Sequence, residues 1–291
     1  MIRPFLTTAL ILGLAGPVAA ASKTKPVAGP VIPPAPGTPL ATDWRTPNPD
    51  NVLVIDTNKG RIFVELSPEV APSHVTRVKE LTRSGLYNGR TFFRVIDVFM
   101  AQTGDPNDKG DGGSDKPNLK AEFSFRRGPA TPFYQVADQT VADVGFVGPL
   151  PVMTQSSMLM PMTADGKVTG WALYCPGVAG AARDDSPDSA NSQFFLMRQA
   201  YPSLEKRYTA FGRVISGLDV VRAIKVGEPV EAPQDKMTRV QVLADMPIGQ
   251  RPLVKVIDPT SAWFKAEVAN VRAEMGADFT ACAIRIPSEI K

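Results

Sequence analysis

The chain is 291 residues long, which is enough for one large domain or two small ones. Its formal net charge is +3, and its basic residues are scattered without a run or interleaved aromatics, so nucleic acid is a poor candidate partner. The composition is otherwise that of a globular protein. The exception is the 28 prolines, which are clustered and therefore indicate a linker rather than a collagen-like or wholly disordered chain.

The first residues have the pattern of a secretory signal peptide. A positive charge at Arg3 precedes a short apolar run over residues 5–14, Pro17 interrupts the run, and small residues follow at 18–21. The run is too short to span a membrane, and no cysteine follows it that could carry a lipid anchor. We predict a signal peptide over residues 1–21 and an exported mature chain without a membrane span. The alternative is a buried N-terminal helix.

Residues 22–50 are rich in proline, alanine and glycine and contain few bulky apolar side chains. Such a segment cannot bury enough surface to fold, so we expect a stiff, extended linker. Folded structure is expected from Asn51 onward. Two β-rich runs, residues 52–55 and 61–66, flank a polar turn that ends in Gly60, and this pattern predicts a β-hairpin.

The next segment predicts further strands and two short helices. Pro72 suits the first turn of a helix whose apolar residues recur at three-residue spacing up to a stop at Gly85, and a similar pattern starts at Leu218. Because strands dominate and pair locally, a mainly β fold accounts for residues 51–245 better than a βαβ alternation. We expect a closed antiparallel barrel with helical caps. The other expected strands are residues 91–96, 99–103, 192–198 and 208–215.

Two segments lie outside this barrel. Residues 124–172 have many prolines, glycines and methionines and no clean periodicity, so we interpret them as a long insertion. Residues 246–291 form a C-terminal extension with a helix expected over 259–275, Asp258 as its N-cap and Gly276 beyond its end. An apolar stripe on this helix predicts packing against the domain, with partner docking as the alternative. The stripe consists of Phe264, Val268, Val271 and Met275.

The chain has two cysteines, Cys175 and Cys282, which are far apart in the sequence. An even number of cysteines in an exported protein is compatible with a disulfide, because the compartment is oxidising. The alternative is two buried, unpaired thiols that pack as small apolar groups. The sequence leaves this choice open.

Several common chemistries lack the residues that they need. The single histidine, His74, stands among surface positions in the first turn of a predicted helix, so we expect it to be solvated or locally hydrogen-bonded rather than a hydrolase base. The acidic loop from Asp105 has Lys109 and Lys116 where calcium ligands belong, and one histidine with two distant cysteines does not make a zinc site. No glycine-rich phosphate motif is present. We expect no metal and no cofactor, so any catalysis must work by positioning and electrostatics.

Arg94 is the residue that a purely structural interpretation explains least well. It stands in the middle of an apolar strand, residues 91–96, and a buried guanidinium must be paired or hydrogen-bonded. Gln102, on the next predicted strand, could orient the guanidinium without cancelling its charge. The alternative is an arginine at the barrel rim that is satisfied by water.

These residues belong to a stretch that resembles the cyclophilins, a family of peptidyl-prolyl cis-trans isomerases. The similarity extends over about residues 52–244 and is interrupted by the insertion. Its motifs occur in the order that the family has. The matching segments are residues 85–89, 92–96, 99–102, 104–105, 188–195, 207–214 and 217–221.

The resemblance implies an eight-stranded antiparallel β-barrel capped by two helices, which binds proline-containing peptides in a surface groove. It implies that Arg94 is the catalytic arginine and that Gln102 holds it and contacts the peptide backbone. Ala182 matches the backbone edge that bonds the peptide, and Tyr208 stands where the family often has His or Tyr. The residues that match the proline pocket and the groove are Phe99, Met100, Phe195, Gln193 and Leu204.

The activity implied by the resemblance is faster rotation about X-Pro bonds in exported proteins. The expected partners are proline-containing polypeptides, and the chain is expected to be a monomer. We expect it in the periplasm of a Gram-negative cell, and the alternative is secretion beyond the periplasm. Two other functions stay open: a cyclophilin-like module that binds peptides with little turnover, and a scaffold that uses the C-terminal helix for assembly. The insertion ends shortly before Ala182 and could fold over the groove.

Overall fold

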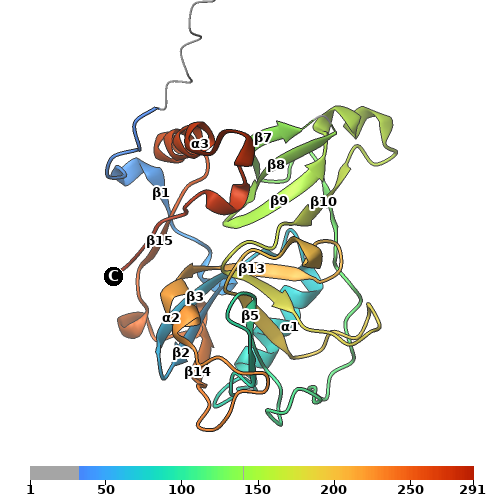
Figure 1. Cartoon of the computed structure of the whole chain (residues 1–291), viewed down its shortest axis with the longest axis vertical. Coiled ribbons are helices and arrows are strands. Elements are labelled where there is room, and N and C mark those ends of the chain that lie inside the picture. Colours follow the sequence, from blue (N-terminus) through green and yellow to red (C-terminus); the bar gives the residue numbers. More distant parts are fainter. Residues whose placement is uncertain (1–32, 140) are drawn as a thin grey trace, which may run out of the picture. The chain divides into compact units, whose positions relative to one another are not determined.

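The computed structural model describes residues 33–139 and 141–291. The predicted signal peptide, residues 1–21, and the first part of the predicted linker lie outside the described residues. The described chain forms sheets of eight, five and three strands together with three α-helices (Figure 1). Within this part of the chain, no helix has both the length and the hydropathy needed to cross a membrane. Segments near the two ends of the described chain form β1 (Trp44–Arg45), β15 (Val254–Ile257), α3 (Ala262–Met275) and β16 (Ser288–Ile290).

The largest sheet has eight strands, and each neighbouring pair is antiparallel. The predicted hairpin is present, with Ile55 opposite Ile62. The mainly β, antiparallel fold expected from the sequence is therefore confirmed. The strands, in their order across the sheet, are β14 (Met237–Val242), β2 (Val52–Thr57), β3 (Gly60–Leu66), β13 (Ala210–Ser216), β11 (Val178–Ala181), β12 (Phe194–Met197), β5 (Met100–Thr103) and β4 (Arg94–Val95).

The two outermost strands, β4 and β14, are connected through the residues that precede them. The Gly89 N–H donates to Met237 O at 2.7 Å, and the Met237 N–H donates to Arg90 O at 2.8 Å. The Phe92 N–H donates to Asp235 O at 2.9 Å. In the described residues these edges are joined by isolated bridges and not by a ladder. The sheet is therefore curled, with its edges joined by a few hydrogen bonds, where a fully closed barrel was predicted.

Two helices pack against this sheet. α1 (Pro72–Arg83) starts at its proline and buries Val75, Val78 and Leu81 in the interior core. α2 (Leu218–Ala223) follows Gly217, whose φ of 87° and close approach to Arg61 O leave no room for a side chain. Both helices lie where the sequence predicted them. Short 3-10 helices are η1 (Ala41–Asp43), η2 (Pro49–Asn51), η3 (Ser157–Met162), η4 (Pro202–Leu204), η5 (Leu243–Asp245), η6 (Ile248–Gln250), η7 (Gly276–Asp278) and η8 (Ala281–Ala283).

The insertion is a second antiparallel sheet. It spans Phe125 to Ala172, close to the expected range of 124–172, but its regular strands were not predicted. For β8 the reason is burial: every residue of this strand is buried, so it lacks the apolar–polar alternation that marks a strand with one solvated face. In their order across the sheet the strands are β6 (Phe125–Arg127), β10 (Val168–Ala172), β9 (Leu150–Gln155), β8 (Ala142–Val147) and β7 (Phe133–Gln139).

The proline-rich segment is not an extended linker up to residue 50. Asn270 Nδ2 of α3 donates to Pro33 O at 2.8 Å, and Trp263 Nε1 donates to Gly37 O at 2.5 Å. β1 then pairs with β15, which pairs with β16. The linker prediction is therefore wrong for residues 33–50. These residues contact partners in the C-terminal extension and, through Arg45 with Glu65 and Asp50 with Lys79, in the main domain. These partners lie away from them in the sequence and leave no local pattern.

α3 begins later than predicted, at Ala262. Ser261, not Asp258, is its N-cap: Ser261 Oγ accepts a hydrogen bond from the Phe264 N–H at 3.1 Å. Asp258 instead closes the preceding turn, where its Oδ1 accepts from the Thr260 N–H at 2.8 Å. The helix ends at Gly276, as predicted. The predicted cap was misplaced because Asp258 and Ser261 are both good capping residues, and the helix starts at the second.

α3 lies beside the strands of the insertion (Figure 1), and its apolar stripe belongs to the same buried core as their side chains. Phe264 is fully buried, and its ring lies edge-on to those of Tyr134 and Phe146, with 5.5 Å between centroids in both pairs. Val268 and Val271 are buried in the same core. The insertion therefore covers the apolar face of α3, as predicted, and this face is not available to dock a partner.

Cys175 and Cys282 form a disulfide, with their Cα atoms 5.0 Å apart. Of the two states that the sequence left open, the structure has the bonded one. The bond ties the connection between β10 and β11 to η8, across a sequence separation of 107 residues. The eight-stranded sheet and the C-terminal extension are thereby covalently linked.

Removal of the disulfide should destabilise the protein. We expect Cys175→Ser/Cys282→Ser to lower the free energy of unfolding by about 2–5 kcal/mol, because the cross-link restricts a long loop of the unfolded chain. Urea unfolding measures this loss, with the reduced wild-type protein as a second route to the unlinked state. Equal unfolding midpoints for the oxidised protein and the double variant would contradict the prediction.

Candidate active site

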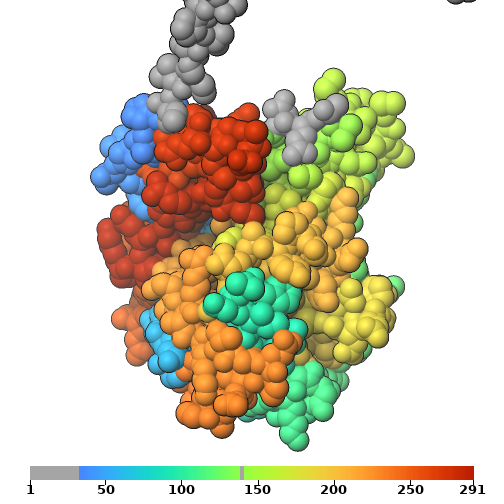
Figure 2. Space-filling model, viewed as in Figure 1, coloured from blue at the N-terminus to red at the C-terminus, as the bar shows by residue number. Residues whose placement is uncertain are grey.

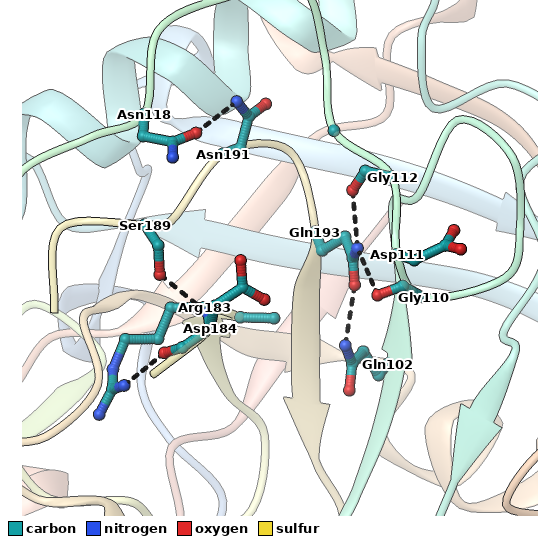
Figure 3. A pocket seen from close by; sticks show the side chains of 12 residues that line it. Gln102, Gly110, Asp111, Gly112, Asn118, Arg183, Asp184, Ser189, Asn191 and Gln193 are labelled. Atoms are coloured by element: carbon teal, nitrogen blue, oxygen red, sulfur yellow. Dashed lines mark hydrogen bonds between the residues drawn. The ribbon is translucent and has the colours of Figure 1, made fainter. Parts of the chain in front are cut away.

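A chain of hydrogen bonds starts at Arg94. The register of β4 and β5 places Arg94 opposite Gln102, and Arg94 Nη1 donates to Gln102 Oε1 at 3.3 Å. Gln102 Nε2 donates to Gln193 Oε1 at 2.9 Å. Gln193 Nε2 donates to the carbonyl oxygens of Gly110 at 3.1 Å and Gly112 at 2.8 Å (Figure 3). Both glutamine amides are thereby oriented, and the guanidinium receives a neutral acceptor.

Beside Arg94 lies a cavity of about 180 Å³ whose wall combines apolar side chains with the polar ends of Arg94, Gln102 and Arg183. Phe195 stands on β12 opposite Gln102, and its ring is edge-on to that of Tyr208, with 5.9 Å between centroids. The cavity gathers every predicted site residue except Gln193, which is hydrogen-bonded to Gln102. Their roles toward a substrate stay predictions. The lining residues are Arg94, Phe99, Met100, Gln102, Ala182, Arg183, Phe195, Leu204 and Tyr208.

A polar pocket of about 200 Å³ adjoins this cavity and shares Gln102, Ala182 and Arg183 with it (Figure 3). Its walls come from the glycine-rich loop at residues 110–113 and from residues between 182 and 193. The Ala182 N–H donates to Gln193 O at 3.0 Å, so a peptide contact at Ala182 depends on its carbonyl. Together the two pockets form a groove with an apolar end and a polar end, which suits an extended peptide.

The insertion does not cover this groove. None of its described residues lines either pocket. Instead, Phe146 and Leu150 of the insertion belong to the same buried core as Met100, Phe195 and Leu204, which line the cavity. The insertion therefore supports the cavity wall from behind, and the expectation that it could fold over the groove is wrong.

Two charged residues beside the predicted site were not assigned to it from the sequence. The Arg183 guanidinium lies over the ring of Tyr208, 4.6 Å from its centroid. Glu228, in the connection between α2 and β14, accepts a hydrogen bond from Arg94 Nε at 2.5 Å. Arg183 could have been found because it follows Ala182. Glu228 could not, because it lies 134 positions from Arg94 in a polar loop without a recognisable motif.

His74 is buried, so the solvated alternative is wrong; it is hydrogen-bonded instead, to a residue 48 positions away rather than to a local one. Its Nδ1 lies 2.6 Å from Glu122 Oε2, and the two oxygens of that carboxylate accept the N–H groups of Ser73 and His74, each at 3.0 Å. A returning loop thus places a carboxylate on the N-terminus of α1, where it complements the helix dipole. This contact is tertiary, so the helix pattern alone does not show it. His74 has a structural role outside the cavity.

Comparison with known proteins agrees with this geometry. Residues 52–244 match the family described as cyclophilin type peptidyl-prolyl cis-trans isomerase/CLD. This match covers more than half of the chain, and it contains every residue that lines the apolar cavity. The chain therefore belongs to the cyclophilin-type peptidyl-prolyl cis-trans isomerases.

Individual relatives show how far the similarity extends. A probable peptidyl-prolyl cis-trans isomerase of Brucella suis is 34% identical over 213 residues, which are 68% of this chain and 85% of the relative. A peptidyl-prolyl cis-trans isomerase-like 1 of Aspergillus oryzae is 28% identical over 197 residues, 66% of this chain and 96% of the relative. The crystal structure of cyclophilin AquaCyp293 from Hirschia baltica matches with a TM-score of 0.78 at 34% identity, covering 85% of this chain and 93% of that one. This last similarity includes residues outside the family match.

Acid should destabilise the protein in part through Glu122. Although burial opposes the shift, hydrogen bonds from the His74 ring and from the N–H groups of Ser73 and His74 hold the pKa of Glu122 below its ordinary 4.5. A lowered pKa contributes stability that is present above about pH 4.5 and is lost as the pH falls through the folded-state value. Glu122→Gln should lower the free energy of unfolding at pH 7 by about 1–2 kcal/mol.

Urea unfolding of both proteins at pH 7 and at pH 3 measures this contribution. The variant should lose less stability on acidification than the wild type, because it has no carboxylate to protonate at this position. The same loss in both proteins between the two pH values would contradict the assignment.

Proposed function

We propose that the groove around Arg94 is where this isomerase accelerates rotation about X-Pro bonds, with the Arg94 guanidinium stabilising the twisted amide. The observation that carries the proposal is the position of Arg94 and Gln102 at the edge of an apolar cavity of about 180 Å³. The cavity receives the proline ring against Phe195 and Met100. The adjoining polar pocket receives backbone and side chains of the same peptide.

The energetics of the reaction fit these parts. X-Pro rotation breaks amide resonance, at a barrier of about 18–20 kcal/mol. In the twisted amide the prolyl nitrogen is pyramidal and carries a lone pair, so a guanidinium donor aimed at it binds the transition state better than the planar ground state. An acceleration of about 10⁵-fold requires about 7 kcal/mol. One charge-assisted hydrogen bond contributes about 1.5–3 kcal/mol. The apolar cavity must supply the rest by removing water and holding the ring.

The rotation transfers no proton, so the mechanism requires no general base. Gln102 orients Arg94 through a neutral amide, and Gln193 in turn orients Gln102. The mechanism therefore consists of placing one charged donor beside a partly apolar pocket, and the hydrogen-bonded glutamines hold the donor there.

We propose further that the chain acts as a monomer on proline-containing segments of exported proteins in the periplasm. Three observations support this. The N-terminal residues have the signal-peptide pattern. The disulfide between Cys175 and Cys282 suits an oxidising compartment. The apolar stripe of α3 is covered within the chain and does not call for a second copy.

Cell fractionation tests the proposed location. The full chain, expressed in a Gram-negative host, should be recovered from the periplasm, and N-terminal sequencing should show a mature chain that starts close to residue 22. A variant that begins at residue 22 serves as the control and should stay in the cytoplasm. Recovery of the full chain from the cytoplasm with Met1 intact would contradict export.

Arg94→Ala should remove most of the turnover of a short Ala-Pro peptide. We expect kcat/KM to fall about 10²–10³-fold, because the variant lacks the charged donor that stabilises the twisted amide. Arg94→Lys should be intermediate, since lysine keeps the charge but loses the planar fork. Exchange NMR of the peptide measures the rates. Arg239→Ala, at an exposed position on β14, is the matched control and should be fully active.

The same experiment separates the isomerase from a peptide-binding module. Turnover in the wild type that is lost in Arg94→Ala supports the proposed function. A wild-type chain that binds the peptide without accelerating its isomerisation would instead identify the groove as a binding module.

A further inference from the structure

Glu228 is the only carboxylate that contacts the Arg94 guanidinium in the described part of the chain. Its Oε1 accepts from Arg94 Nε at 2.5 Å, while Gln102 Oε1 accepts from Nη1 of the same group at 3.3 Å. The motifs that identify the site from the sequence do not include Glu228. Its place in the site comes from the α2–β14 connection, residues 224–236, which we call the Glu228 loop.

The backbone of the Glu228 loop is hydrogen-bonded to the two neighbours of Arg94 in the sequence, Phe93 and Val95. Gly227 and Val95 exchange two hydrogen bonds, Val95 N–H to Gly227 O at 2.8 Å and Gly227 N–H to Val95 O at 2.9 Å. The Val230 N–H donates to Phe93 O at 2.9 Å. Glu228 stands between these two attachments, as Arg94 does on the strand. In Figure 2 the orange surface of the loop borders the teal surface of the β4–β5 region.

The loop is also braced within itself and from the hairpin β2–β3. The buried carboxylate of Asp235 accepts the Lys225 N–H at 2.8 Å and Asn58 Nδ2 at 2.6 Å. Lys225 Nζ donates to Glu231 O at 2.7 Å, and Gln234 Nε2 donates to Val230 O at 2.8 Å. These contacts hold the loop in place without help from the Glu228 side chain. The position of the Glu228 backbone beside Arg94 is therefore set by the fold, and the carboxylate completes the contact through its hydrogen bond with Arg94 Nε.

The two acceptors define the plane of the guanidinium. A guanidinium has five N–H donors in a rigid fork. Glu228 accepts a hydrogen bond from Nε, and Gln102 accepts one from Nη1. Together they fix the position of the guanidinium and its rotation about the side-chain axis. The remaining donors belong to the Nη atoms. With two edges held, the side chain does not have to lose rotamer freedom when a substrate binds.

The charge of Glu228 does not cancel that of Arg94. The side chains of Arg94 and Glu228 are 37% and 54% exposed, so water screens the ion pair. The hydrogen bond between Arg94 Nε and Glu228 acts over a short distance and depends on direction. It therefore still orients the guanidinium when water weakens the attraction between the two charges. Orientation of the guanidinium is therefore the main effect of this contact, and neutralisation is the smaller one.

We propose that Glu228 is a positioning residue, which holds the Arg94 guanidinium in the orientation that meets the twisted amide. This proposal rests on the proposed isomerase function. It assigns to the Glu228 loop a part in the site that the family motifs do not carry. Glu228 acts through Arg94 and does not itself contact the reacting bond.

Kinetics of two Glu228 variants test the proposal. Glu228→Ala should lower kcat for an Ala-Pro peptide about tenfold and change KM less than twofold, since a misplaced catalytic group affects the transition state more than substrate binding. Glu228→Gln keeps an acceptor at the same place and should recover at least half of the lost activity. Glu231→Ala, in the same loop, removes a carboxylate without removing the carbonyl that binds Lys225, and should match the wild type.

A double-mutant cycle separates positioning from a general effect on the fold. In an Arg94→Ala background, Glu228→Ala should cause no further loss, because a residue that acts only through Arg94 has nothing left to position. The Arg94 Nε–H signal in ¹⁵N NMR, identified by its absence in Arg94→Ala, should shift and broaden in Glu228→Ala and return in Glu228→Gln. This second readout does not depend on turnover.

The outcomes distinguish this proposal from the function on which it rests. An active wild type with unchanged kcat and an unchanged Nε–H signal in Glu228→Ala would overturn the positioning role and leave the isomerase function intact. Equal losses from Glu228→Ala in the presence and absence of Arg94 would overturn it as well. A wild type without turnover would overturn the proposed function, and the positioning role with it.

Discussion

In the proposed mechanism, the guanidinium of Arg94 has to remain charged and oriented beside a partly apolar cavity, and these two requirements conflict. A guanidinium in an apolar wall is costly unless hydrogen bonds replace its water. The structure resolves the conflict by placing the group at the edge of the cavity, where 37% of the side chain stays exposed, and by giving it acceptors on two edges. Gln102 and Gln193 extend this network to the backbone of the glycine-rich loop.

The apolar side of the site depends on parts of the chain outside the eight-stranded sheet. Inside that sheet, one core contains Leu53, Ile62 and Phe211. The cavity residues Met100 and Phe195 belong to a different core, shared with the insertion, α3 and the disulfide-bonded Cys175. The insertion and the C-terminal extension are therefore the packing layer behind the cavity. Their removal would expose the back of the cavity residues Met100 and Phe195.

The N-terminal segment and the C-terminal extension are ordered by each other. β1 finds its strand partner in β15, and the α3 side chains Trp263 and Asn270 donate to carbonyls of the proline-rich segment. A proline-rich backbone keeps its carbonyl acceptors although it lacks donors, so it can be bound by side chains where it cannot join a regular sheet. The disulfide then links the extension to the chain beside the cavity wall.

The sequence by itself determined the mainly β fold, the positions of α1 and α2, the range of the insertion and the residues around Arg94. These features have local causes: strand and helix periodicity, turn residues, and motifs in which neighbouring residues reach one cavity. Only the tertiary structure decided the strands of the insertion, the order of residues 33–50, the burial of His74 on Glu122, and the contact between Glu228 and Arg94. The last three depend on a partner far away in the sequence, and no local pattern encodes such a partner. The strands of the insertion pair mostly with close neighbours, but β8 is buried along its whole length and so lacks a regular alternation. The two cysteines are a further example. The sequence showed an even number of cysteines without deciding whether they are bonded, and the fold places their Cα atoms 5.0 Å apart in a disulfide.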